Sequence, residues 1–449
     1  MAVRGRRPAR RLPRIRLSPP TVLVLGYALL VCVGAAALKL PIMVVEPLGW
    51  LDAIFTSASA VTVTGLVVVD TGSHFSIYGQ AVIALLIQLG GLGLMTTAVF
   101  VFSLLGMRVP FRQQLILSED LNHTNLGGLL SLAASILRVV VIVEFIGAAL
   151  LAVRFVPELG WSAGLWSAFF HAISAFNNAG FGLYSDSLTR WVADPLVNIV
   201  VPVLFVLGGL GFTVVLDIYT KRNWKQLTLH SKLMLAGTAG LIAWSFLTFL
   251  ALEWTNPRTL AALPQIEDRI WASWFQALTT RTAGFNTLDI GAIRESTALF
   301  FIALMLIGGG TTSTAGGLKV TTFMVLILAT RAFLQRRAQI SVFSRSIPAD
   351  QTVKVLALVT LCLMIVLTAS FIILTSSGLP FLDVTFEVAS AFGTVGLSRG
   401  ITVDLDTLSR IVIVLVMFAG RVGPLLLGFF IATAYTARVR YPSSNVYLG

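Results

Sequence analysis

Four short stretches decide the fold of this chain: TVTGL at 62–66, NNAGF at 177–181, RTAGF at 281–285 and GTVGL at 393–397. Each stretch has small or polar residues, then a glycine, then Leu or Phe, and an aromatic residue lies ten positions before every one of the four glycines. These aromatic residues are Phe55, Phe170, Trp274 and Phe386. The glycines recur about every 110 residues, a period that predicts four divergent copies of one unit along the chain.

The composition of the 449-residue chain indicates the solvent in which these units fold. Hydrophobic residues make up 56% of the chain, charged residues only 12%, and the mean hydropathy is +0.89. Soluble domains carry about 25% charged residues, so the composition excludes an ordinary soluble enzyme and indicates a polytopic membrane protein. About eight apolar runs, two per repeat, are long enough to cross a hydrocarbon core. They occupy residues 21–42, 79–105, 129–152, 195–216, 233–252, 297–307 with 318–328, 355–374 and 411–434.

The repeats and the apolar runs together predict the organisation of the chain. Four repeats lie between a basic tail and a short C-terminal tail. The predicted boundaries are 1–20 for the basic cytoplasmic tail, 21–105, 128–220, 229–335 and 353–440 for the four repeats, and 441–449 for the C-terminal tail.

The net charge of +12 is distributed as membrane topology requires. Seven arginines lie in the tail 1–20, further basic groups lie between the repeats, and acidic residues gather in the alternate loops. Cytoplasmic loops carry the excess of Lys and Arg, so we expect both termini in the cytoplasm of a multi-pass protein of the cell membrane. Anionic lipid headgroups of the bilayer are the expected partner of these basic groups, and nucleic acid is not.

A segment too polar for a third crossing lies between the two spans of each repeat. These segments are 51–70, 163–186, 269–289 and 381–399. The first half of each is compatible with an amphipathic helix and the second half holds the glycine motif, so we expect a short re-entrant helix and then an extended strand. Non-helical backbone at membrane depth must be surrounded by protein or water, which predicts that the four segments converge. The alternative is that the glycines only allow close helix packing.

Four converging glycine segments can form a ring of carbonyl oxygens that replaces the hydration shell of a monovalent cation. The partly negative C-terminal ends of the four re-entrant helices also favour a cation. We therefore predict an all-α polytopic membrane protein in which four pseudo-symmetric repeats surround a central pore. Each repeat is a transmembrane helix, a re-entrant pore helix with a filter loop, and a second transmembrane helix. The predicted filter residues are Thr62, Val63, Thr64, Gly65, Asn177, Asn178, Ala179, Gly180, Arg281, Thr282, Ala283, Gly284, Gly393, Thr394, Val395 and Gly396.

The unit of span, pore loop and span, with one glycine per loop, resembles the Ktr/Trk/HKT superfamily of potassium transporters along essentially the whole chain. No additional helix pair precedes repeat 1, and the chain ends in RYPSSNVYLG, so it is most similar to the Ktr membrane subunit, which translocates the ion. Glycine at all four filter positions goes with potassium preference in that family. The resemblance therefore implies potassium uptake, with K+ held at backbone carbonyls. The predicted K+ ligands are the carbonyls of Thr62, Val63, Asn177, Asn178, Arg281, Thr282, Gly393 and Thr394.

The chain contains no soluble domain and no nucleotide-binding motif, so we expect its regulation to come from other proteins. The resemblance implies which partners these are. It implies a cytosolic ring of nucleotide-binding regulatory subunits and a homodimer in the membrane. Sodium ion as an activator, beside the transported potassium ion, is a separate expectation that the resemblance does not decide. Within the filter, Arg281 would place a positive charge close to a site that attracts cations.

The second span of repeat 3 is interrupted by GGGTTSTAGGLK at 308–319, which has no large apolar residue in its middle. We expect hydrated hydroxyls at 311–314. The resemblance implies that this segment is an intramembrane loop that obstructs the pore and moves on activation, and a weakly packed glycine-rich segment rearranges at little cost. A static unwound helix is the alternative. The predicted gate residues are Gly308, Gly309, Gly310, Thr311, Thr312, Ser313, Thr314, Ala315, Gly316, Gly317, Lys319 and Arg421.

Three ionisable groups and two further glycine clusters complete the candidates. Arg421 lies in an apolar span, where it either projects under the filter as an electrostatic barrier or pairs with a carbonyl or an acid. Glu144 is expected to hydrogen-bond to pore-loop backbone, with a proton or sodium relay as the alternative, and His171 is expected to be structural. The clusters at 90–93 and 208–211 are expected to pack helices closely.

An enzyme and an ion-coupled carrier are the two other function classes for such a chain. An enzyme is not expected, because the four histidines do not cluster in the sequence and no metal-ligand spacing recurs. An ion-coupled secondary cation transporter, dependent on sodium or protons, is the alternative function. Such carriers usually contain inverted repeats, whereas two spans per unit predict parallel ones.

Overall fold

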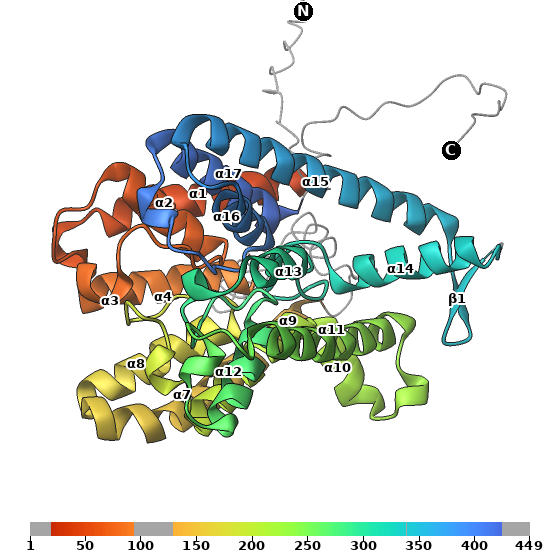
Figure 1. Cartoon of the computed structure of the whole chain (residues 1–449), viewed down its shortest axis with the longest axis horizontal. Coiled ribbons are helices and arrows are strands. Elements are labelled where there is room, and N and C mark those ends of the chain that lie inside the picture. Colours follow the sequence, from red (N-terminus) through yellow and green to blue (C-terminus); the bar gives the residue numbers. More distant parts are fainter. Residues whose placement is uncertain (1–18, 94–128, 338, 424–449) are drawn as a thin grey trace, which may run out of the picture.

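The computed structural model describes residues 19–93, 129–337 and 339–423, and these are mostly helical (Figure 1). Four sequence predictions concern residues outside the described ones. They are the basic tail apart from residues 19 and 20, the end of the second span of repeat 1 at 94–105, the end of repeat 4, with the end of its second span, at 424–440, and the C-terminal tail at 441–449.

Each repeat opens with a long apolar helix, as predicted for the first spans. Among the described residues, four helices are long and apolar enough to cross a membrane without a break. The hydroxyl of Thr228 caps the third of them by accepting from Ser231 N, and Gly378, with φ +65°, ends the fourth in the left-handed region that favours glycine. These helices are α1 (Pro19–Leu38), α7 (Leu129–Leu159), α11 (Leu229–Glu253) and α15 (Ala349–Ser377).

The second spans are shorter, and they end or break at the glycine clusters. Their helices are α4 (Ile77–Gly91), α9 (Pro195–Leu210) followed by α10 (Phe212–Lys221), α13 (Glu295–Met305) followed by α14 (Val320–Leu334), and α17 (Thr407–Val422). Gly93, Gly211 and Gly423 have φ of 84°, 94° and 93°, which a right-handed helix cannot accommodate. The span predicted at 195–216 is therefore a broken one, because the helix axis bends by 93° at Gly211.

Between the two spans of each repeat lies a short helix that ends inside the protein. These pore helices are α2 (Trp50–Val61), α8 (Trp161–Phe176), α12 (Ile266–Thr279) and α16 (Phe381–Gly393). Trp166 on α8 donates from Nε1 to Gln80 Oε1 of repeat 1 at 2.7 Å, which ties the first two repeats together. The last turns of all four pore helices are buried.

The aromatic residues that mark the repeats pack as expected in three of the four. Phe55, Phe170 and Phe386 are fully buried, but Trp274 is half-buried and its neighbour Phe275 takes the interior position. The reason is a shift of register at the end of α12. In repeats 1, 2 and 4, the backbone N–H of the residue before the filter glycine donates to the carbonyl of the residue five positions earlier in the chain. In repeat 3 it donates to the carbonyl only four positions earlier.

Hydrophobic clusters join neighbouring repeats into a ring. Repeat 1 shares a core with repeat 4, where Val61 and Phe392 are both buried, and Phe205 of repeat 2 packs edge-on against Phe275 of repeat 3 at 6.3 Å. A third core holds α13 of repeat 3 and α16 of repeat 4. Figure 1 shows the repeats following one another around the centre of the molecule in chain order.

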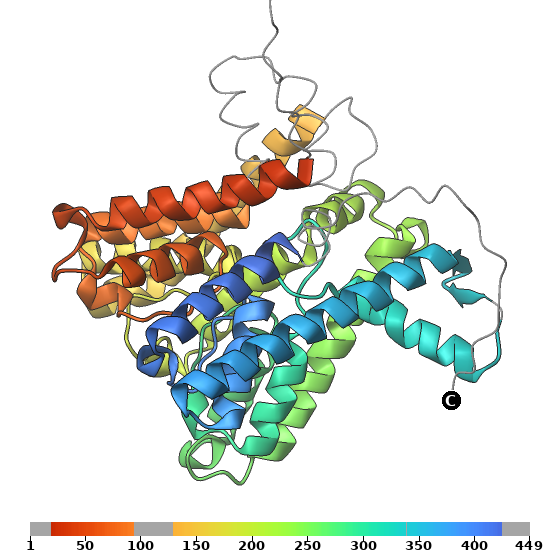
Figure 2. The same cartoon turned by 90° about the horizontal axis from the view of Figure 1, so that it is seen from above.

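A β-hairpin with the adjoining parts of two helices projects from the ring of four repeats. The strands β1 (Ile340–Val342) and β2 (Arg345–Ile347) pair antiparallel, and Phe343 and Ser344 between them have φ of 50° and 60°, as a two-residue hairpin turn requires. The hairpin, the end of α14 and the start of α15 extend away from the other helices (Figure 2). The remaining elements are α3 (Thr71–His74) and 3-10 turns at Pro41–Met43, Thr189–Trp191, Trp224–Gln226, Leu260–Ala262, Ile290–Ala292 and Thr402–Asp404.

Candidate functional site

The four glycine loops, residues 62–65, 177–180, 281–284 and 393–396, share one backbone conformation. In each loop both the glycine and the residue two positions before it have positive φ. The non-glycine values are 51° at Val63, 57° at Asn178, 70° at Thr282 and 51° at Thr394, and the glycine values lie between 69° and 91°. Non-glycine residues adopt positive φ in only a few per cent of cases, so four at equivalent positions indicate one repeated local structure.

The predicted extended strand is wrong, for a reason visible in these angles. Thr62 and Asn177 have φ of −83° and −80° with ψ near 0°, and each is followed by a left-handed residue. When right-handed and left-handed backbone conformations alternate along a loop, successive carbonyl groups point toward the same side of the chain. In an extended strand they point to opposite sides. The observed backbone is thus better suited to a row of inward carbonyls than the predicted one.

The four glycines approach one another in a closed ring, in chain order. A side chain at any of them would collide with the next loop, so glycine is required for space as well as for its positive φ. A Cβ on Gly65 would overlap Ala179 O, one on Gly180 would lie 2.8 Å from Gly284 Cα, one on Gly284 would lie 2.5 Å from Val395 O, and one on Gly396 would overlap Thr64 O.

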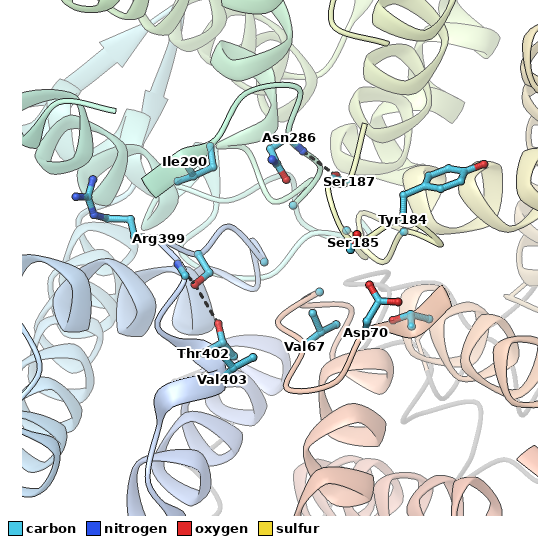
Figure 3. Close-up of a pocket in the computed structure, with 18 of the residues that line it drawn as sticks. Val67, Asp70, Tyr184, Ser185, Ser187, Asn286, Ile290, Arg399, Thr402 and Val403 are labelled. Atoms are coloured by element: carbon cyan, nitrogen blue, oxygen red, sulfur yellow. Dashed lines mark hydrogen bonds between the residues drawn. The ribbon is translucent and has the colours of Figure 1, made fainter. Parts of the chain in front are cut away.

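An open cavity of about 370 Å³ lies above this ring and is lined by all four glycines (Figure 3). Asp70 and Asp289 also line it, and the cation Arg399 on its wall is paired with Asp383 at 2.5 Å. The carboxylates of Asp70 and Asp289 therefore give this cavity a negative charge. Figure 3 shows loops from all four repeats converging on this cavity.

Hydrogen bonds from behind hold the glycine loops in place. Ser59 Oγ accepts from Gly65 N at 3.1 Å, and Ser390 Oγ accepts from Gly396 N at 3.0 Å. Repeats 1 and 4 thus have a serine with the same role at equivalent positions. In repeat 3, Thr279 Oγ1 donates to Phe285 O at 2.5 Å. The pore helices therefore fix the loops through side chains as well as through their own backbone.

Polar groups on three pore helices anchor the chain just after each glycine. His171 donates from Nδ1 to Ser167 O at 2.8 Å and accepts at Nε2 from Leu183 N at 3.4 Å, so it has the structural role expected of it. Glu387, with 1% of its surface exposed, accepts from Ser398 Oγ at 2.7 Å and from Thr402 Oγ1.

Gln276 has the corresponding role in repeat 3. With its amide oxygen turned toward the loop, it accepts from Thr287 N at 3.0 Å and Leu288 N at 2.9 Å. Sequence reasoning missed Glu387 and Gln276. A signal was present, because Glu387 and His171 both lie nine positions before their glycines.

Glu144 also supports a glycine loop, although not through the backbone as expected. Its Oε1 accepts from Asn177 Nδ2 at 3.0 Å, and the same amide nitrogen donates to Gln88 Oε1 at 2.8 Å. The partner is a side chain because the Asn177 backbone N–H already bonds to Ile173 O at the end of α8.

Arg281 turns its guanidinium away from the ring. Nη2 donates to Gly308 O at 3.4 Å, and the side chain lies beside Phe205 and Thr238 instead of lining the open cavity. The predicted charge of Arg281 therefore lies behind the ring, beside the start of the repeat 3 loop, and not in the open cavity. Only the backbone of this residue belongs to the ring.

The repeat 3 loop, residues 308–319, is not weakly packed, so that expectation is wrong. Its two ends are joined, because Gly308 N donates to Leu318 O at 2.7 Å and Val320 N donates to Gly309 O at 2.9 Å. Its middle bonds to the break in repeat 2, where Gly310 N donates to Gly209 O at 2.7 Å. The backbone of a broken helix has free carbonyls, and this loop satisfies them.

The hydroxyls of the repeat 3 loop were expected to be hydrated. Thr314 contradicts this, since it is fully buried and donates to Asn178 Oδ1 at 2.8 Å. Thr311, Thr312 and Ser313 are half-buried and contact His230 Nε2, Thr213 Oγ1 and Gly310 O respectively.

Arg421 binds carbonyls, the second of its two expected arrangements. Its guanidinium donates to Thr314 O, to Gly90 O and, at 2.9 Å, to Gly91 O. It thereby ties the repeat 3 loop to the end of α4. Arg421 also lines a cavity of about 160 Å³ together with Lys319, whose Nζ donates to Ala315 O at 2.7 Å.

The glycine clusters do pack closely, as expected, besides breaking their helices. A Cβ on Gly90, Gly208 or Gly420 would overlap a carbonyl oxygen in the last turn of a pore helix. These oxygens belong to Val61, Phe176 and Phe392. Among the described residues, no group of three or more His, Cys, Asp or Glu side chains is placed to hold a metal ion.

The family described as TrkH, cation transport protein, matches residues 22–436. The chain is 46% identical over 435 residues to Ktr system potassium uptake protein B of Bacillus subtilis (strain 168), covering 97% of this chain and 98% of that protein. It is 37% identical over 447 residues to the potassium/sodium uptake protein NtpJ of Enterococcus hirae, covering 97% and 98%.

Among solved structures, the crystal structure of the potassium transporter TrkH from Vibrio parahaemolyticus matches with a TM-score of 0.74 at 19% identity, covering 94% of this chain and 87% of that one. This match confirms the predicted fold class, and the sequence relatives confirm the resemblance inferred from the glycine motifs. The chain belongs to the TrkH family of cation transport proteins, which is a family of transporters, and it is a multi-pass membrane protein.

Proposed function

We propose that this protein takes up potassium across the cytoplasmic membrane through a filter made by the four glycine loops. The observation that carries the proposal is the closed ring of Gly65, Gly180, Gly284 and Gly396, each with positive φ and each with no room for a side chain. The relatives that match the whole length of the chain are named as potassium or potassium/sodium uptake proteins, which supports potassium as the cargo.

K+ is held in this proposal by backbone carbonyls of the glycine loops. Alternation of right- and left-handed residues brings the carbonyls of neighbouring positions toward the axis. The carboxylates of Asp70 and Asp289 raise the cation concentration at the entrance, and the C-terminal ends of four pore helices stabilise an ion below it. The proposed ligands are the carbonyls of Thr62, Val63, Asn177, Asn178, Arg281, Thr282, Gly393 and Thr394.

The repeat 3 loop is the proposed gate. Arg421 holds it closed through Thr314 O, and both Arg421 and Lys319 place positive charge beside the cavity that a cation would cross. Because the loop makes hydrogen bonds along its length, its opening needs work from outside the chain. A cytosolic ring of nucleotide-binding regulatory subunits is the proposed source of that work.

The projecting part of the structure, formed by the end of α14, the β1–β2 hairpin and the start of α15, is a suitable contact for the ring of regulatory subunits. It exposes apolar side chains, including Phe333 at 82% and Leu334 at 75%, and it carries several basic residues. With both termini in the cytoplasm, as the charge pattern predicts, this part faces the cytosol. A homodimer in the membrane and activation by sodium complete the proposal, and the potassium/sodium relative supports the latter.

An ion-coupled carrier is the second candidate, favoured by one contact. Glu144 lies within α7 and bonds directly to Asn177 of a glycine loop, as the proton relay of a coupled carrier would require. Rubidium uptake into proteoliposomes separates the candidates. A channel-like pathway takes up rubidium down its own gradient with no sodium or proton gradient present, whereas uptake that requires either gradient would contradict it.

A further inference from the structure

The repeat 3 loop is hydrogen-bonded to three of the four glycine loops. At its start, Gly308 O accepts from Arg281 Nη2 at 3.4 Å. In its middle, Thr314 Oγ1 donates to Asn178 Oδ1 at 2.8 Å, and toward its end Gly316 N donates to Thr394 Oγ1 at 3.1 Å. The loop therefore rests directly on the residues that shape the ring.

Two of these residues hold strained backbone positions in the ring. Asn178 and Thr394 are the non-glycine residues with φ of 57° and 51°, and both are completely buried. A left-handed conformation costs a residue with a side chain free energy unless neighbouring contacts support it. The hydroxyl of Thr314 and the N–H of Gly316 are such contacts.

Asn178 also connects the loop with a second part of the ring. While its Oδ1 accepts from Thr314, its Nδ2 donates to Thr282 Oγ1 at 3.1 Å. Thr282 is the left-handed residue of the next glycine loop. One amide thus bridges the repeat 3 loop and the glycine loops of repeats 2 and 3.

We propose that Asn178 and Thr394 are positioning residues that couple the gate to the filter, so that a seated repeat 3 loop strengthens K+ binding in the ring. This inference rests on the proposed function. When the loop leaves, the Asn178 amide oxygen and the Thr394 hydroxyl lose their partners in the loop, and the left-handed backbone that orients the carbonyls loses this support. Coupling between two sites is reciprocal, so bound K+ in turn favours the seated loop.

Thr314→Val tests the inference, because it removes the hydroxyl and keeps the branched shape. An unsatisfied buried Asn178 oxygen disfavours the closed state, so basal rubidium uptake should rise by about 5-fold to 150-fold. The K+ dissociation constant, measured by titration calorimetry on detergent-solubilised protein, should rise as well. Thr314→Ser keeps the hydroxyl and should restore both values, and Thr394→Val should reproduce the Thr314→Val result.

Thr330→Val is the matched control, since this exposed hydroxyl bonds only to Leu326 O in its own helix. It should leave uptake and K+ binding unchanged. Faster uptake by Thr314→Val with unchanged K+ binding would overturn the inference, because the loop would then act as a plug independent of the ring. Unchanged uptake and binding in folded Thr314→Val protein would overturn it too. Absence of K+ binding and rubidium uptake in the unaltered protein would instead refute the proposed function.

Discussion

Substituting Gly65 with serine tests the need for glycine in the ring. Gly65 has φ +90°, and a Cβ built on it would overlap Ala179 O and lie 3.1 Å from Gly180 Cα. A serine side chain therefore cannot be accommodated at this position unless its own backbone or the neighbouring loop moves. Both movements displace the carbonyls that surround the axis.

The expected change in the ratio of potassium to sodium permeability follows from two free-energy costs of the serine side chain. A residue with a side chain loses about 1–2 kcal/mol in a left-handed conformation, and the displaced Ala179 carbonyl adds to this. Discrimination between two ions changes tenfold for about 1.4 kcal/mol. We therefore expect Gly65→Ser to lower the ratio of potassium to sodium permeability by about tenfold or more.

The assay is the reversal potential, or paired rubidium and sodium uptake, in proteoliposomes. Gly240→Ser is the matched control, because Gly240 lies in α11 with no atom within 4 Å of its added Cβ and without positive φ. The control should keep the permeability ratio of the unaltered protein. An unchanged ratio in folded Gly65→Ser protein would refute the assignment of the ring as the filter.

Four further perturbations follow from the same contacts. Deleting 311–315 should raise basal rubidium uptake if the loop is a gate, and unchanged uptake would support a static helix break. Arg421→Gln should also raise basal uptake, because the loop loses its charged bond at Thr314 O, whereas Arg190→Gln at the exposed pair with Asp186 should not. Glu387→Ala leaves Ser398 and Thr402 without their acceptor, so the free energy of unfolding should fall by about 1–3 kcal/mol, measured by thermal or denaturant unfolding; Glu387→Gln should lose less. Glu144→Gln keeps an acceptor for Asn177 and should leave uptake intact at all proton gradients, whereas loss of gradient-dependent uptake would favour the coupled carrier.

Repetition made the ring predictable from sequence. One glycine with a neighbouring Leu or Phe has little meaning, but four in phase, each with an upstream aromatic residue, predict where the pore helices end and which glycines meet. The same rule failed at Trp274, because α12 ends one residue out of register and Phe275 fills the core instead. A repeat pattern gives equivalent positions only where the turns between them are equivalent.

Contacts between repeats were not predictable from sequence. The glycine-rich composition of the repeat 3 loop suggested weak packing. The loop is in fact held by Gly209, Asn178 and Arg421, which lie on other repeats, so its local sequence does not reveal these contacts. Likewise, the direction of the Arg281 side chain depends on the carbonyl of Gly308, which no local pattern reveals. Glu387 and Gln276 were missed because polar residues on an amphipathic helix look alike until the loop they anchor is in place.

The most direct measurement is the position of a bound ion. X-ray diffraction at the rubidium absorption edge, from crystals of the protein grown with rubidium chloride, locates the ion by its anomalous signal. The proposed function predicts a peak on the axis of the four glycine loops, surrounded by backbone carbonyls near Gly65, Gly180, Gly284 and Gly396. An empty ring, with the peak beside the Glu144 carboxylate instead, would contradict it.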